Sequence, residues 1–206
     1  MPIYNDNRMN LLFPENRDFI IASFEETLSE NHIQYDIIAG TSTAGIPWAS
    51  MLGYKEEKPV IYVRDKPKDH GMKNRIEGID AERDLSGARV VLIEDLVSTG
   101  GSSVSAVQGI RDAKGEIDTC LSIFSYDLDQ AMEMFGGSRE FDKQTGARLD
   151  SPCVLLPSLN YETLLEVARK ECYADNSQLE LLREWRADPF GWGERYGHPH
   201  VKKQER

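Results

Sequence analysis

Residues 90–103 limit what this chain can fold into more than any other stretch does. They begin with four apolar residues without alternation, VVLI, a pattern typical of a strand buried on both faces of a parallel sheet. Two carboxylates, Glu94 and Asp95, follow directly, and a Ser/Thr/Gly loop and apolar residues at helical spacing come after them. Strand, acidic pair, polar loop and helix in this order predict an α/β fold with a ligand site at the end of the strand.

The chemistry of this stretch indicates a phosphorylated sugar. Free backbone N–H groups at the start of a helix bind anions, and glycines and hydroxyls let a phosphate approach them. The carboxylates would repel that phosphate, so they need another partner, either sugar hydroxyls or a hydrated Mg²⁺ shared with the ligand. A ribose 5-phosphate satisfies both requirements, because it has a phosphate for the loop and hydroxyls for the carboxylates. The alternative, an ordinary glycine-rich turn after a strand, explains the glycines but not the whole ordered string, which is neither a Walker loop nor a dinucleotide fingerprint.

A second strand, loop and helix occur earlier in the chain. Residues 35–39 are predicted as a strand, residues 40–45 (GTSTAG) as a loop and residues 46–52 as a helix. The loop is either a second anion-binding cradle or a plain turn between a strand and a helix. Two cradles on neighbouring strands would bind the two ends of a molecule that is phosphorylated twice.

Residues 64–75 are basic inside an acidic chain. They hold five cations and two acids, whereas the whole chain of 206 residues has a net charge of −11. A charge run usually forms a solvated face, but this one has no apolar periodicity, contains Pro and Gly, and lies between predicted strands. A basic loop of that kind suits a polyanionic small ligand over which it closes. His70 lies within it and is either a surface histidine or a ligand contact.

Composition favours one globular domain over residues 1–206, with a C-terminal helix and polar tail over 175–206. A capping box of Ser177 and Glu180 is predicted to open that helix. The negative charge argues against a nucleic-acid partner, and no apolar run is long enough for a membrane span. Three cysteines without paired spacing favour reduced thiols in a cytoplasmic protein.

Taken together, these motifs resemble those of the orotate phosphoribosyltransferases, a family within the type I phosphoribosyltransferases. The resemblance covers nearly the whole chain and rests on GTSTAGIP at 40–47, YVR at 62–64 with KPKDHG at 66–71, IEG at 76–78, and EDLVSTGG at 94–101. It implies a parallel-sheet type I phosphoribosyltransferase fold with a flexible basic loop and a C-terminal helix. It also implies that the chain joins orotate to 5-phosphoribosyl 1-diphosphate (PRPP), giving orotidine 5′-monophosphate and diphosphate with Mg²⁺ in de novo pyrimidine biosynthesis.

The resemblance further implies roles for individual residues. Lys68 and Asp95 would be catalytic, Glu94 and Asp95 would hold the ribose hydroxyls, and Ser98 would also touch orotate. Mg²⁺ would be held mainly through PRPP, and the basic loop would reach across a homodimer into the neighbouring site. The expected PRPP contacts are Arg64, Lys68, His70, Glu94, Asp95, Leu96, Val97, Ser98, Thr99, Gly100, Gly101 and Ser102, and the expected diphosphate loop is Thr41, Ser42, Thr43, Ala44 and Gly45.

The chain departs from the family pattern at several places. Asp65 and Ala44 stand where many members have lysine, and Leu128 stands where many have an orotate-contacting arginine. Asp65 changes the charge near the leaving group. The sequence also begins inside the motif PIYNDNR at residues 2–8, without the N-terminal helix and base-covering loop that precede it in the family. We expect that the start codon was assigned too late, which an intact mass of the native protein beginning at Met1 would exclude.

Two other functions compete with this one. The first is a phosphoribosyltransferase for another base, because the PRPP half of the predicted site is stronger than the base half. The second is a PRPP-sensing regulator without chemistry. Such regulators usually need a nucleic-acid surface, which the acidic composition argues against. The sequence Lys68-Asp69-His70 also favours catalysis, since a sensor has no leaving group to stabilise.

Overall fold

The computed structural model describes residues 3–64, 75–80, 83–136 and 151–197. The chain forms two compact units, a larger one over Asn7–Asn160 and a smaller one that combines Met1–Asp6 with Tyr161–Arg206. In the part of the chain that is described, no helix has both the length and the apolar character needed to cross a membrane.

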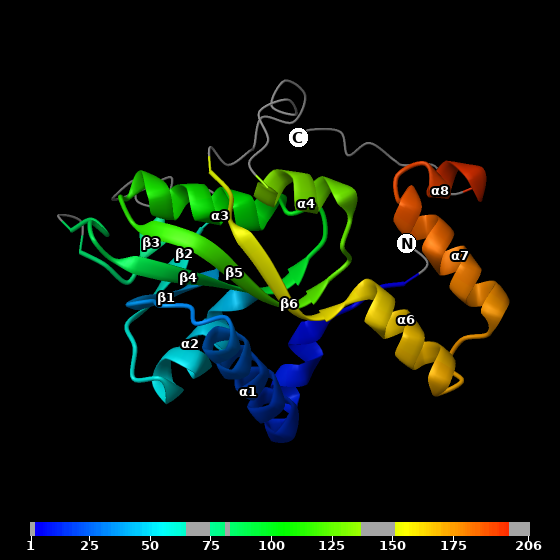
Figure 1. Cartoon of the computed structure of the whole chain (residues 1–206), viewed down its shortest axis with the longest axis horizontal. Helices are drawn as coiled ribbons and strands as arrows, with labels where there is room; N and C mark the ends of the chain where they lie inside the picture. The colour runs from blue at the N-terminus through cyan, green and yellow to red at the C-terminus, as the bar shows by residue number, and fades with distance from the viewer. Residues whose placement is uncertain (1–2, 65–74, 81–82, 137–150, 198–206) are drawn as a thin grey trace. The chain divides into compact units, whose positions relative to one another are not determined.

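The larger unit contains a six-stranded, mainly parallel sheet (Figure 1). The strand order is β3-β2-β1-β4-β5-β6, and every neighbouring pair is parallel except β2 and β3. The predicted α/β fold is therefore confirmed, with one short antiparallel strand, β3, added at the edge. The strands are β1 (Ile37–Thr41), β2 (Val60–Val63), β3 (Ile76–Glu77), β4 (Arg89–Val97), β5 (Glu116–Ser125) and β6 (Val154–Asn160).

Helices cover both faces of this sheet. Figure 1 shows α1 and α2 on one face, and α3 and α4 on the other. Pro14 begins α1, where its fixed φ suits the first helical position and its missing N–H is not needed. The elements are the 3₁₀ helix η1 (Asn7–Leu12) and the helices α1 (Pro14–Glu30), α2 (Gly45–Lys55), α3 (Gly101–Asp112) and α4 (Asp129–Gly136).

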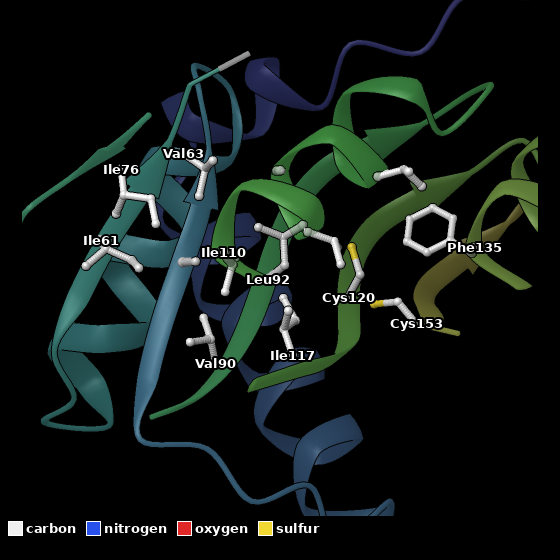
Figure 2. Close-up of a cluster of buried hydrophobic side chains, with 14 of the residues drawn as sticks. Ile61, Val63, Ile76, Val90, Leu92, Ile110, Ile117, Cys120, Phe135 and Cys153 are labelled. Atoms are coloured by element: carbon white, nitrogen blue, oxygen red, sulfur yellow. The ribbon is translucent and has the colours of Figure 1, made fainter. Parts of the chain in front are cut away.

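The central strand β4 separates two hydrophobic clusters. Val90 and Leu92 belong to the cluster on the α3 side, which Figure 2 shows, whereas Val91 and Ile93 belong to the cluster beneath α1 and α2. This two-sided burial confirms the prediction from the unbroken apolar run. Cys120 and Cys153 are free thiols in the first cluster, and burial raises the pKa of each.

Strands β4 and β1 run further toward the pocket than the sequence pattern predicts. β4 continues through the acidic pair to Val97, and β1 continues to Thr41. The reason for the longer β4 is its partner, because the ladder to β5 extends as far as Val97 and Ser125. The acidic pair therefore lies on the last residues of a strand, where neighbouring backbone fixes its position, and not in a loop.

The smaller unit contains the helices α6 (Tyr161–Lys170), α7 (Asn176–Ala187) and α8 (Trp192–Arg195). The predicted C-terminal helix is present as α7, but the predicted capping box is wrong. Asp175 caps the helix: its side chain accepts from the backbone N–H of Gln178, whose own side chain accepts from the N–H of Asp175. Asp and Gln satisfy the same pattern two residues earlier.

Candidate active site

The carboxyl ends of β1 and β4 open into a pocket of about 320 Å³. Because β1 and β4 are parallel neighbours, the loops that follow them lie at the same edge of the sheet. We call residues 41–45 the β1 loop and residues 98–102 the β4 loop. The pocket is lined by Thr41, Ser42, Thr43, Ala44, Glu94, Asp95, Leu96, Ser98, Thr99, Gly100, Gly101, Ser102 and Ser103.

The structure thus brings most of the predicted site residues together. Four of the five residues of the β1 loop, all five of the β4 loop and both carboxylates line one cavity. Gly45 and Val97 lie outside the lining, Gly45 as the first residue of α2 and Val97 in the core. Arg64 follows β2, the strand beside β1, while Lys68 and His70 lie outside the described residues.

The β4 loop leads directly into the start of α3. Gly100 has φ +83°, a left-handed conformation that glycine adopts without strain, and its carbonyl accepts the first helical bond, from Val104. The N–H groups of a helix's first turn have no carbonyl partner within the helix. At this point the start of α3 borders the pocket together with Ser98, Thr99 and Ser102, an arrangement chemically suited to binding an anion.

The β1 loop packs tightly against β4. A methyl group at Gly45 would lie 2.4 Å from the carbonyl oxygen of Ile93 and 2.4 Å from the Thr41 hydroxyl oxygen, so only glycine fits there. The N–H of Ser42 donates to the carbonyl of Val63 at 2.9 Å, which ties the loop to β2 as well. The loop therefore has a fixed place between two strand ends.

Glu94 is the most buried titratable group in the pocket, with 5% of the residue exposed. Its Oε1 accepts hydrogen bonds from the Thr41 hydroxyl at 2.7 Å and from the Asp95 N–H at 3.0 Å, and its Oε2 accepts from the Ser103 hydroxyl at 3.0 Å. Burial raises the pKa of the Glu94 carboxyl to about 8, and the hydrogen bond from Thr41 opposes that rise only in part. Sequence reasoning did not identify Ser103, whose hydroxyl repeats the Ser/Thr character of the loop just before it.

Asp95 is half-buried at the strand end, and its main chain has a partner that sequence reasoning also missed. The Asn7 side-chain amide donates to the Asp95 carbonyl at 2.6 Å, and Asn7 is itself buried. A polar residue buried next to a site is rarely accidental, because its hydrogen bonds must be satisfied internally. The only signal in the sequence was the motif at residues 2–8.

The ends of the basic segment are joined beside α3. The N–H of Arg64 donates to the carbonyl of Arg75 at 2.9 Å, and the Arg75 guanidinium donates to the carbonyl of Arg64 at 3.1 Å. The same guanidinium donates to the carbonyl and the hydroxyl of Ser105 on α3, both at 2.8 Å. Arg75 therefore fixes where the segment leaves and rejoins the sheet.

The carboxylate oxygens in the pocket indicate how a divalent cation would be held. Among the described residues, no group of three or more His, Cys, Asp or Glu side chains could hold a metal ion. The oxygens of Glu94 accept hydrogen bonds from three protein donors, and the neighbouring Asp95 is the more exposed of the two carboxylates in the lining. One carboxylate fits a Mg²⁺ that arrives on a phosphorylated ligand with its own oxygens and waters.

Comparison with known proteins first identifies the domain family to which the sequence is similar. The phosphoribosyl transferase domain family matches residues 12–134, a range that includes strands β1 to β5 and the whole pocket. Orotate phosphoribosyltransferase of Listeria monocytogenes is 38% identical over 93% of this chain and 84% of its own. The chain belongs to the orotate phosphoribosyltransferase family.

Solved structures agree with this assignment. Orotate phosphoribosyltransferase of Aeropyrum pernix is 25% identical, with a TM-score of 0.61 over 84% of this chain and 85% of that one. The UMP synthase of Leishmania donovani is 27% identical, with a TM-score of 0.64 over 90% of this chain, which spans 36% of that longer protein.

Proposed function

We propose that this protein transfers the ribose 5-phosphate group of PRPP to orotate, giving orotidine 5′-monophosphate and diphosphate in de novo pyrimidine biosynthesis. The bond between the anomeric carbon and the diphosphate oxygen breaks, and a bond from that carbon to a ring nitrogen of orotate forms. The observation that carries the proposal is a carboxylate-bearing strand end placed between two anion-binding loops in one pocket. That arrangement matches a sugar that carries phosphate groups at both ends.

In this proposal the β4 loop binds the 5-phosphate. The N–H groups at the start of α3 and the hydroxyls of Ser98, Thr99 and Ser102 supply neutral donors, and the positive end of the helix dipole favours an anion there. Asp95 accepts hydrogen bonds from ribose hydroxyls. Leu96, the next residue along β4, completes the lining between the carboxylates and the loop.

The β1 loop takes the diphosphate, with Arg64, Lys68 and His70 assigned there by family resemblance. Positive charge develops on the anomeric carbon in the transition state while negative charge grows on the departing diphosphate. Cations aimed at the leaving oxygens therefore stabilise the transition state more than the ground state. Mg²⁺, when bound with PRPP, supplies further positive charge at those oxygens. A closed site also keeps water from capturing the carbon.

Fewer residues are assigned to the orotate site than to the PRPP site. Ser98 lies at the start of the β4 loop and lines the pocket, so it is the proposed contact to the base. A base other than orotate is the competing proposal. The Listeria relative, at 38% identity over 93% of this chain, supports orotate.

A direct assay tests the proposed reaction. Purified protein is mixed with PRPP, Mg²⁺ and orotate, and the loss of orotate absorbance is followed beside reactions with adenine, hypoxanthine, uracil and xanthine. PRPP-dependent consumption of orotate alone supports the proposal. Consumption of another base in its place would reassign the enzyme, and no consumption of any base alongside PRPP binding would favour a sensor.

We also propose a cytoplasmic homodimer in which the basic segment serves the neighbouring site. The support is the family resemblance and the absence of paired cysteine spacing. Mixing Lys68→Ala subunits with Asp95→Asn subunits tests the shared site, because a mixed dimer then has one site with both residues intact. Activity that returns on mixing supports the shared site, and two variants that stay inactive together contradict it.

A further inference from the structure

Arg75 ties both ends of the basic segment (residues 64–75) to α3. Its Nε donates to the carbonyl of Arg64 at 3.1 Å, and its Nη2 donates to the carbonyl and to the hydroxyl of Ser105, each at 2.8 Å. The main chain adds a fourth bond, because the N–H of Arg64 donates to the Arg75 carbonyl at 2.9 Å. We call these four hydrogen bonds the Arg75 clamp.

The surroundings of the clamp are closely packed. A methyl group at Gly109 on α3 would lie 3.3 Å from Arg75 Cζ and 3.3 Å from Val63 Cγ1, so the missing side chain lets both approach the helix. Val63 pairs with Ile76 directly inside the clamp, and both lie in the hydrophobic cluster that Figure 2 shows, with 1% and 2% of their surface exposed. The clamp therefore stands on well-fixed backbone.

Helix α3 connects the clamp to the pocket. Gly101 and Ser102 in the first turn of α3 line the pocket, and Ser105 lies about one turn further along the same helix. A helix of this length moves as a rigid element, so the clamp sets the position of both segment ends relative to the helix that borders the pocket. The segment carries Lys68, the cation that the proposed function assigns to the departing diphosphate.

We propose that Arg75 is a positioning residue for the transfer reaction, which holds the base of the basic segment on α3 so that Lys68 meets the leaving diphosphate in the geometry of the transition state. This inference rests on the proposed function. Arg75 acts through the segment and not on the substrate, since its guanidinium donates to Arg64 and Ser105. Misplacing a catalytic group by about 1 Å can lower a rate by about 100-fold, so such a clamp matters for catalysis.

A second arginine of α3 provides a matched control. The guanidinium of Arg111 also makes three hydrogen bonds, at 2.8 to 3.1 Å, to the main-chain carbonyls of Ile117, Ser151 and Pro152. Arg75→Ala and Arg111→Ala therefore remove a similar number of bonds to α3, but only Arg75→Ala releases the basic segment. A purely structural role for Arg75 predicts that the two substitutions act alike.

The kinetic experiment measures the rate of orotidine 5′-monophosphate formation in a single turnover, together with the Kd of PRPP with Mg²⁺. We expect Arg75→Ala to slow this rate at least about tenfold and to leave the Kd within about threefold of the wild type. In a Lys68→Ala background, Arg75→Ala should slow it further by no more than about twofold, because both changes act through the same cation. Arg111→Ala should have the same effect, whatever its size, in both backgrounds.

Backbone amide exchange tests the clamp without any ligand. The N–H of Arg64 is protected by its bond to the Arg75 carbonyl, so Arg75→Ala should speed its exchange at least about tenfold, while Arg111→Ala leaves it unchanged. Arg75→Lys keeps the charge but replaces the planar fork with a single ammonium group. It should change both measurements in the same direction, and it decides the test if Arg75→Ala does not fold.

Three results would overturn the inference. They are a full Arg75→Ala effect on the rate in the Lys68→Ala background, a Kd of PRPP weakened as much as the rate, or an unchanged exchange rate at Arg64. A wild type that consumes no orotate would refute the proposed function, and with it the role of Arg75 in the reaction. Faster exchange at Arg64 in Arg75→Ala would then still support the clamp, and unchanged exchange would overturn it.

Discussion

The burial of Glu94 predicts a particular dependence of stability on pH. The free carboxyl has a pKa of 4.5, and burial raises it to about 8 in the folded protein. Between these values the unfolded chain has lost the proton and the folded chain keeps it. The folded state therefore binds more protons, and its free energy of unfolding falls as pH rises, by at most about 1.4 kcal/mol per pH unit. The stabilisation is complete below pH 4.5 and is lost as pH rises through 8.

Glu94→Gln removes this titration while retaining the shape of the side chain. We expect the free energy of unfolding of the wild type, relative to the variant, to fall by about 2 kcal/mol between about pH 6 and about pH 7.5. Urea denaturation of both proteins at several pH values, followed by circular dichroism, gives the difference. The contributions of titratable groups distant from residue 94 cancel in the comparison, whereas the interaction of Glu94 with the adjacent Asp95 carboxyl is part of the measured difference.

Two outcomes would contradict the reasoning. Parallel stability curves would mean that Glu94 titrates alike in the folded and unfolded chains. A wild type that gains stability over Glu94→Gln as pH rises would mean that the donors from Thr41, Ser103 and the Asp95 N–H outweigh burial and lower the pKa.

Three further predictions concern the loops and the metal. Lys68→Ala should lower kcat by orders of magnitude with an unchanged melting temperature, because a leaving-group cation is lost; near-normal turnover would remove Lys68 from the mechanism. Gly45→Ala should lower the free energy of unfolding by about 1–3 kcal/mol in urea titrations, since a methyl group there would lie 2.4 Å from the carbonyl oxygen of Ile93. Gly101→Ala, which has open space around it, should leave the free energy of unfolding unchanged or raise it by up to about 1 kcal/mol. Equal effects of the two glycine substitutions would contradict that packing argument. A chelator should abolish turnover reversibly without shifting the melting temperature, because the described residues include no metal cluster; a large shift would indicate a structural metal.

Much of the fold could be predicted from local patterns. The run VVLI identified a strand buried on both faces, because an unbroken apolar run indicates burial directly. The longer course of β4 could not be predicted, since it depends on pairing with β5 and not on the residues themselves. The capping box failed for a related reason, because Asp175 and Ser177 both fit the rule and only the helix start distinguishes them.

The pocket was predicted in outline but not in its internal connections. The two loops could be identified because each follows a strand and precedes a helix, and parallel neighbours bring such loops together. The hydrogen bonds of Glu94 to Thr41 and Ser103 could not, since these partners lie 53 and 9 positions away in the sequence and nothing local relates them. The same holds for Asn7 and Asp95, which are 88 positions apart.

A crystal structure with PRPP and Mg²⁺ tests the central claim most directly. It should place the 5-phosphate oxygens within hydrogen-bond distance of the N–H groups of the β4 loop, the ribose hydroxyls on Asp95, and the diphosphate against the β1 loop. A 5-phosphate bound elsewhere, or a sugar that does not touch Asp95, would contradict the account.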